Sequence, residues 1–320
     1  MTPLAVVSQH GLTTSINLIS DAHRKMAGDK FNLLHLLDHG LSSEDNEEVI
    51  VIFQSAFNCF SKSAADAQAQ EVASQIQGLI TPEKPAAQFG SIWEAFLSTA
   101  RNIPYRDADG QDFVVNVIRI LVATPPWNGL PGLAQVMRTN WSGSCIISST
   151  NLPQSLLNLN PDPTFETGSG EESDDDEFSF SEWLNLNSFN ARLLGAGLVP
   201  WESFAIWQMR QALEEALPPS PATDLRLSVA SEWIIRAGPA LLRKCLVARQ
   251  DTTEDDKRSH GPGPLFSGQG ALNLERWRFW QRRFGELRSV VAGEEAIVNV
   301  DLAMRCMTVA ASAFAHTDNM

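Results

Sequence analysis

The sequence lacks long apolar runs and has few cysteines, and each absence excludes a class of protein. No stretch reaches the roughly 18 apolar residues that a transmembrane helix needs. The opening MTPLAVVSQHGLTTSINLIS has neither the basic start nor the compact apolar block of a secretory signal. The scattered cysteines indicate neither a disulfide framework nor a zinc site: Cys59, Cys145, Cys245 and Cys306. We therefore expect a cytoplasmic protein with no membrane partner.

Positive charge is also scarce. The chain has 24 Lys and Arg against 38 Asp and Glu, which gives a formal net charge of −14. Nucleic-acid binding needs a concentrated basic surface to neutralise phosphates, so we expect no nucleic-acid partner. Much of the negative charge is local, because no Lys or Arg lies between residues 161 and 182. The acids there are Asp162, Glu166, Glu171, Glu172, Asp174, Asp175, Asp176, Glu177 and Glu182.

The motifs of common enzyme classes are missing too. The sequence contains no glycine-rich phosphate loop, no nucleophile elbow and no dinucleotide fingerprint. His35 and His39 are spaced to share a helical face, but no glutamate follows His35 as a metalloprotease helix requires. We therefore assign no catalytic residue and expect no metal site and no cofactor.

Helical periodicity is present along nearly the whole chain. Apolar residues recur three and four positions apart, without a sustained alternation of period two. Ser43 and Asn273 are expected helix N-caps. The pattern predicts an all-α protein, a single domain of about ten antiparallel helices. The expected helices cover residues 30–39, 44–61, 64–79, 89–102, 110–123, 182–196, 201–217, 225–247, 273–291 and 294–314.

Three regions divide this single domain. Residues 1–157 form an N-terminal helical half, and residues 182–320 form a C-terminal half of the same domain. Between them, residues 158–181 are rich in Asp, Glu, Ser, Gly and Pro. Such a segment cannot bury enough apolar surface to offset the entropy lost on ordering, so we expect a disordered acidic insertion.

The stretch ERWRFWQRRF, residues 275–284, concentrates arginines and aromatic rings. At 100° per residue, Trp277 and Trp280 fall on one apolar stripe and the arginines lie beside or opposite it. A buried aromatic face with solvated or salt-bridged arginines is the simpler interpretation. A phosphate site formed by some of these arginines is the alternative.

Two further helical stretches carry polar residues near apolar arcs. In EWLNLNSFNARL, Asn190 falls inside the arc and Asn187 at its margin. Asn190 should either bond a neighbouring backbone group or cap, or line a polar spot in a pocket between helices. In WESFAIWQMRQALEEA, Glu215 lies on the apolar side, whereas Glu214 forms an outward pair with Arg210. An outer pair is also expected for Glu232 and Arg236. The candidate ligand-binding residues are Asn187, Asn190, Glu215, Arg276 and Arg283.

The blocks EWLNLNSFNARL, AIWQMRQALEEA, SEWIIRAGPALL and ERWRFWQRRF, in that order, resemble a fungal family of unknown function. Its named member belongs to an oxopyrrolidine biosynthesis gene cluster. The resemblance runs from about Phe31 to Met307 and implies a fungal source, a helical fold and a link to secondary metabolism. It carries over no catalytic residue.

Three functions stay open. The first is an accessory protein of a metabolite pathway that binds a small apolar intermediate or a pathway protein. The second is a terpene-cyclase-like enzyme with magnesium and a prenyl diphosphate. That reaction needs carboxylates on facing helices, and the usual aspartate-rich motif is missing. The third is an intracellular interaction scaffold.

Overall fold

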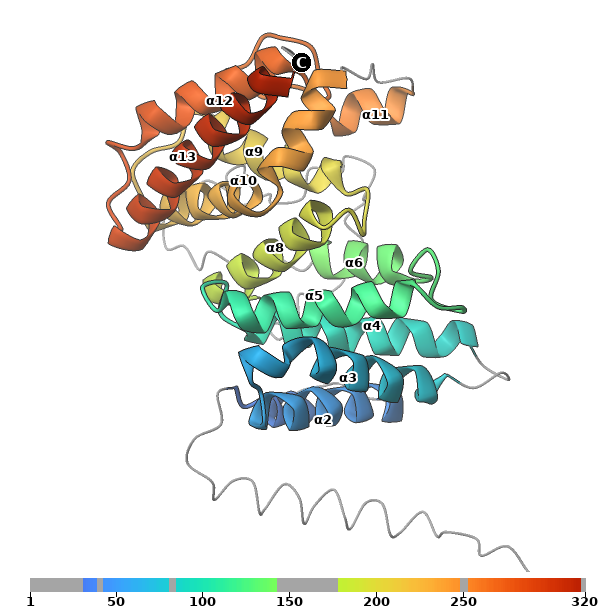
Figure 1. Cartoon of the computed structure of the whole chain (residues 1–320). Helices are drawn as coiled ribbons and strands as arrows, with labels where there is room; N and C mark the ends of the chain where they lie inside the picture. The colour runs from blue at the N-terminus through green and yellow to red at the C-terminus, as the bar shows by residue number, and fades with distance from the viewer. Residues whose placement is uncertain (1–30, 39–42, 81–84, 143–177, 248–252, 318–320) are drawn as a thin grey trace, which may run out of the picture.

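The computed structural model describes residues 31–38, 43–80, 85–142, 178–247 and 253–317, and these residues form helices and no strand (Figure 1). The prediction of an all-α fold is confirmed. The first group of elements is η1 (Leu34–Asp38), α2 (Glu44–Asn58), η2 (Lys62–Ala64), α3 (Ala65–Leu79), α4 (Pro85–Asn102), α5 (Ala108–Val122) and α6 (Leu133–Ser142). The second group is α8 (Phe180–Gly195), α9 (Glu202–Leu213), α10 (Pro221–Val247), α11 (Glu254–Ser259), α12 (Leu274–Leu287) and α13 (Glu294–Thr317).

Polar side chains fix where several helices begin. The Ser43 side chain accepts a hydrogen bond from the Asn46 amide, and that of Asn273 accepts one from the Arg276 amide, so both predicted caps are confirmed. Ser179 and Glu182 form a capping box at the start of α8. The last residues of the expected insertion, 178–181, thus belong to α8 and its cap. Residues 158–177 lie outside the described part of the chain.

Two helices, α6 and α11, were not expected from the sequence. The signal for α6 is present, because Leu133, Val136, Met137 and Trp141 have helical spacing and are all buried. The short helix α11 lies inside the polar stretch between α10 and α12, where no apolar periodicity predicts it. The expected helices left residues 248–272 without a helix, so α11 is a correction to that prediction.

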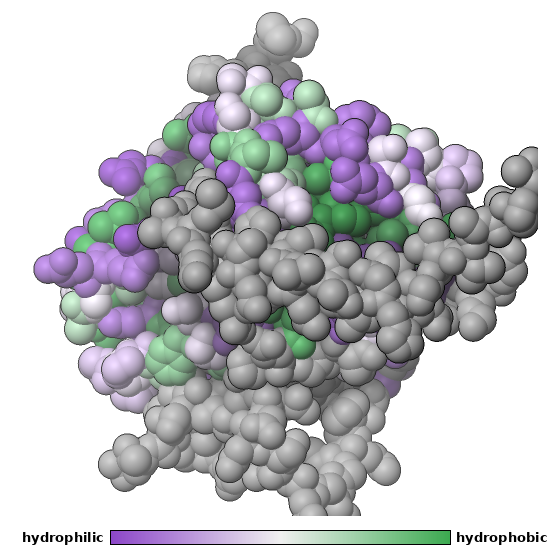
Figure 2. Space-filling view, turned by 90° about the horizontal axis from the view of Figure 1, so that it is seen from below, coloured by the Kyte–Doolittle hydropathy of each residue, from purple (hydrophilic) through white to green (hydrophobic). Residues whose placement is uncertain are grey.

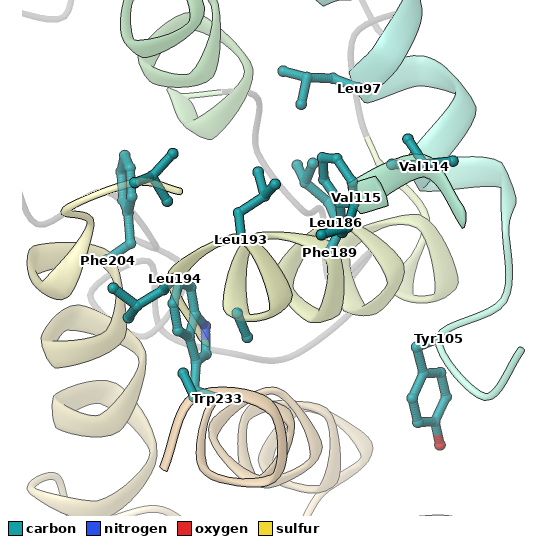
Figure 3. Packing of buried hydrophobic residues seen from close by; sticks show 14 of the residues in the cluster. Leu97, Tyr105, Val114, Val115, Leu186, Phe189, Leu193, Leu194, Phe204 and Trp233 are labelled. Atoms are coloured by element: carbon teal, nitrogen blue, oxygen red, sulfur yellow. The ribbon is translucent and has the colours of Figure 1, made fainter. Parts of the chain in front are cut away.

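The helix α8 lies between the helices of the first group and the rest of the second group (Figure 1). It packs against α4 and α5 on one side and against α10 on the other. Figure 3 shows Phe189 directed from α8 toward Val115 of α5, while Trp233 reaches α8 from α10. A helix buried on nearly all sides has no polar face for solvent. Its polar side chains must therefore find partners inside the protein.

The helices α10 and α13 pack against each other and run in the same direction. Near the start of α10, the carboxylate of Asp224 accepts hydrogen bonds from the amides of Ala292 (3.3 Å) and Gly293 (2.7 Å), just before α13. Further along both helices, the charge of Arg236 in α10 lowers the pKa of the Cys306 thiol in α13, against the larger effect of burial. The expected antiparallel packing does not hold for this pair, because α11 and α12 return the chain before α13 begins.

The outer side of α13 carries exposed apolar side chains, including Val298 and Val309. Its inner side, with Val300 and Met307 fully buried, belongs to the core. By length and composition alone, Glu294–Phe314 is the one described helix that could cross a membrane, a test that core helices of soluble proteins also pass. A different face, shown in Figure 2, mixes hydrophilic and hydrophobic residues over its described part. The absence of a membrane partner stays a prediction.

The closest approach of α8 to α10 gives a stability prediction. A Cβ atom at Gly195 would lie 2.2 Å from the Arg236 carbonyl oxygen, which belongs to the rigid backbone of α10. We expect Gly195→Ala to lower the free energy of unfolding by roughly 1–3 kcal/mol, because the two helices must move apart. The matched control is Gly90→Ala within α4, where nothing lies within 4 Å. That change should stabilise the protein by roughly 0.5–1 kcal/mol. Urea denaturation measures both, and equal effects would contradict the close packing.

Candidate functional site

Asn187 is fully buried and joins α8 to α10. Its Nδ2 donates to the Trp183 carbonyl (2.9 Å), one turn earlier in α8, and its Oδ1 accepts from Trp233 Nε1 (3.0 Å). Both ends of the amide thus have partners within the protein. The Asn187 amide therefore joins two core helices and leaves neither its Nδ2 nor its Oδ1 without a partner.

Asn190 is equally buried but is not fully paired. Its Nδ2 contacts the Met137 sulfur of α6 at 3.4 Å, a weak acceptor, and its Oδ1 has no hydrogen-bond partner. One turn beyond Met137, the Trp141 ring lies 4.9 Å from the Trp183 ring and 4.3 Å from the Phe204 ring, centroid to centroid. The Trp141 Nε1 also lacks a partner.

These side chains define the α6–α8–α9 junction: Met137, Trp141, Trp183, Asn190 and Phe204. An unpaired buried polar atom costs about 1–3 kcal/mol, and this junction contains one acceptor and one donor of that kind. The rings of Trp141, Trp183 and Phe204, which contact one another here, offer apolar contact. An uncharged ligand with a matching donor and acceptor would recover the lost hydrogen bonds. This is the chemistry expected of a small-molecule site.

The other three candidate residues gather around the C-terminal end of α9. The guanidinium of Arg283 donates to the Leu213 carbonyl (3.1 Å) and pairs with Glu286. Glu215 is half-buried and lies 3.7 Å from Arg226. Burial raises the pKa of the Glu215 carboxyl, and the charge of Arg226 lowers it. In contrast, Asn187 contacts α10 and Asn190 contacts α6. No described contact therefore joins the five candidate residues into one site.

Arg276 is fully buried in a closed network with Glu214. Its Nε lies 2.7 Å from Glu214 Oε1, and its Nη2 lies 3.1 Å from Oε2, a bidentate pair. Arg276 also donates to the carbonyls of His260, Gly261 and Ala271. The carboxylate accepts further bonds from Trp280 Nε1 (2.6 Å) and the Gly263 amide (2.7 Å). Because these groups have hydrogen-bond partners within the protein, the network leaves few donors or acceptors for a ligand.

The sequence placed two ion pairs on the outer surface, but the glutamate of each pair is buried. Glu214 is 0% exposed, because α12 and the chain before it cover α9, so its outward pairing with Arg210 is wrong. Glu232 is 2% exposed and accepts from Ser188 Oγ (2.6 Å) of α8 as well as from Arg236 Nε (3.0 Å). Periodicity within one helix cannot show which second helix covers it.

Sequence reasoning missed Arg192, the most enclosed charged residue of α8. Its side chain is 5% exposed and pairs with Asp112 of α5, while Nη2 contacts the Tyr105 carbonyl (3.4 Å). The Tyr105 hydroxyl donates to Glu295 Oε1 (2.5 Å) at the start of α13. Burial, together with this bond, raises the pKa of Tyr105 to about 12. The arginine stands inside the motif EWLNLNSFNARL, but its partners lie some 80 residues away in sequence.

Within the described residues, no three or more His, Cys, Asp or Glu side chains come together in a way that could hold a metal ion. The magnesium of the cyclase alternative therefore has no assigned ligands in this part of the chain.

The fold and the α6–α8–α9 junction define an all-α protein with a buried central helix and unpaired polar atoms beside an aromatic cluster. Residues 93–284 match the family described as protein of unknown function, DUF3632, and the chain belongs to this family. The matched region runs from α4 to α12 and contains the junction. Comparisons with curated proteins and with solved structures found no match.

Proposed function

We propose that the protein is an accessory protein of a fungal secondary-metabolite pathway and binds an uncharged, mostly apolar small molecule at the α6–α8–α9 junction. The observation that carries the proposal is the pair of unpaired buried atoms, Asn190 Oδ1 and Trp141 Nε1, beside three aromatic rings. The pathway rests on the resemblance of the four sequence blocks to the oxopyrrolidine-cluster family. A cytoplasmic location fits both.

Entry of a ligand needs α6 to move away from α8. Both unpaired atoms are enclosed, and Trp141 is 4% exposed. The helix α6 has ten residues and packs mainly on α4, so a small displacement would open the junction without breaking the long helix pairs. Asn140 of α6 holds that contact through its bond to Glu94 (2.8 Å), and burial raises the pKa of this carboxyl. We expect α6 to be the element that a ligand rearranges.

Asn190→Leu separates the role in binding from the role in folding. Replacing an incompletely paired buried amide with an apolar side chain of similar size should leave stability unchanged or raise it by up to about 1 kcal/mol. Asn187→Leu is the matched control, a buried asparagine of the same helix that would leave Trp233 Nε1 without its acceptor. It should lower the free energy of unfolding by about 1–3 kcal/mol.

Ligand binding is then measured with pathway extracts and purified intermediates, by tryptophan fluorescence and equilibrium dialysis. We expect saturable binding that Asn190→Leu weakens by about tenfold, the effect of one lost hydrogen bond of roughly 1.4 kcal/mol. Unchanged binding in Asn190→Leu would reject this site. Hydrocarbon products from magnesium and prenyl diphosphates, lost in Glu215→Gln, would instead support the cyclase alternative.

Gene neighbourhood tests the pathway itself. A synthase and tailoring enzymes encoded beside this gene would support the accessory role, and deletion of the gene should then reduce the yield of that metabolite. An isolated housekeeping locus, or an unchanged yield, would contradict it.

A further inference from the structure

A second polar site lies where α5, α8, α10 and α13 meet, away from the α6–α8–α9 junction. Arg192 of α8 and Arg236 of α10 come to this site from two neighbouring helices, which the Ser188–Glu232 hydrogen bond joins one turn before each arginine. Each has one carboxylate partner: Asp112 for Arg192 and Glu232 for Arg236. The Glu232 carboxylate is shared, since it also accepts from Ser188. The site therefore holds two guanidinium groups in a mostly buried setting.

The donor capacity of these arginines is not used up. Arg236 donates through Nε alone, and its two terminal nitrogens have no hydrogen-bond partner among the described residues. The Arg192 Nε is buried and also unpaired. The Arg236 side chain is 24% exposed and that of Asp112 is 61% exposed, so solvent reaches the site. A solute can thus approach the Arg236 side chain without unfolding the protein, whereas the Arg192 Nε is enclosed.

Arg192 lies near the like charge of Arg236, and each of the two arginines has one carboxylate partner. Burial lowers the pKa of its guanidinium, and the positive charge of Arg236 is the next largest cause. The attraction of Asp112 and Glu232 acts in the opposite direction and is smaller for each of them. The charge of Arg236 also lowers the pKa of the Cys306 thiol on α13, against the larger effect of burial. An anion between the arginines would relieve this repulsion.

We propose that Arg192 and Arg236 form a binding site for a single oxyanion, a carboxylate or a phosphate group, of a small molecule. The fork of a guanidinium matches the paired oxygens of such groups, and its charged hydrogen bonds are stronger than neutral ones. The low exposure of Arg192 strengthens the interaction relative to a surface site. The site is separate from the uncharged-ligand site, because its residues come from other faces of α8 and from α10.

Sodium phosphate and sodium acetate are the probes, each compared with sodium chloride at the same ionic strength. We expect one of the two anions to raise the melting temperature of the full-length protein and to bind saturably by calorimetry. Stronger binding of phosphate would indicate a phosphate-bearing ligand, and stronger binding of acetate a carboxylic acid. If neither anion exceeds chloride, the proposal is wrong.

Arg236→Gln should weaken binding of the preferred anion by about tenfold or more, because charged hydrogen bonds are lost. Arg243→Gln is the control for net charge, since Arg243 is an exposed arginine on the same helix. Arg236→Lys keeps the charge without the fork and should bind with intermediate strength, which preserves the test if Arg236→Gln folds poorly. An equal loss in Arg243→Gln would overturn the site. Asn190→Leu should leave anion binding intact, so failure of one proposal does not imply failure of the other.

Discussion

Replacing Arg276 with methionine is expected to lower the free energy of unfolding by about 3–5 kcal/mol. The change removes the partner of a carboxylate that is 0% exposed and leaves Glu214 as a buried charge with only neutral donors. Trp280 and Gly263 still donate to it, but neither brings a positive charge. Urea denaturation followed by tryptophan fluorescence measures the loss, with an unchanged m value as evidence that the two-state analysis holds.

Arg283→Met is the matched control for this prediction. Arg283 lies on the same helix, but its partner Glu286 is 56% exposed. An ion pair of that kind contributes little, so its loss should change the free energy of unfolding by less than about 1 kcal/mol. The loss of the hydrogen bond to the Leu213 carbonyl adds to this effect. Equal effects of Arg276→Met and Arg283→Met would show that burial of the Glu214 pair does not determine its contribution.

A double variant tests how much of the lost stability is due to the unpaired charge of Glu214. Glu214→Leu combined with Arg276→Met removes both charges, and replacing a buried ion pair with apolar side chains is often neutral. Here recovery should be incomplete, because the Trp280 indole and the Gly263 amide lose their acceptor. The carbonyls that accept from Arg276 also lose a donor. A double variant less stable than Arg276→Met alone would contradict this account.

The sequence predicted helices and buried faces well because both depend on local spacing. In α12, Trp277, Trp280 and Phe284 are buried as the 100° pattern requires, and Arg278 and Arg282 are exposed. The prediction failed where a buried position is polar. Arg276 is adjacent in sequence to the apolar stripe, but only its contact with α9 shows that it is fully enclosed.

The candidate site was predictable only in part, for a related reason. Asn190 was identified because an amide inside an apolar arc needs a partner. Its neighbours Met137 and Trp141 come from α6, whose distance along the chain hides them from any pattern within α8. Close packing adds a further limit. A Cβ atom at Gly263 would lie 2.7 Å from the Glu214 Cβ, so the chain can pass here only as glycine, a relation that no spacing in the sequence reveals.

Trp280→Ala is expected to destabilise the protein by about 3–5 kcal/mol, because the ring is fully buried and its removal leaves a cavity. The indole also donates to Glu214 Oε1 and lies 5.3 Å from the Arg276 guanidinium carbon. Trp280→Phe keeps most of the ring volume and should cost less, roughly 1–3 kcal/mol, mainly from the lost hydrogen bond. A variant Trp280→Ala that folds normally and loses only binding would assign this helix a functional role instead.

The effects of Trp280→Ala and Arg276→Met should not add. Both side chains bond the same carboxylate, so the double variant should deviate from the sum of the single changes by about 0.5–3 kcal/mol. Trp233→Phe and Arg276→Met form the matched cycle, since Trp233 donates to Asn187 and shares no partner with Arg276. That cycle should be additive within about 0.5 kcal/mol. If the first cycle were also additive, Glu214 would not couple α9 to α12, and the stability of α12 would rest on its aromatic face alone.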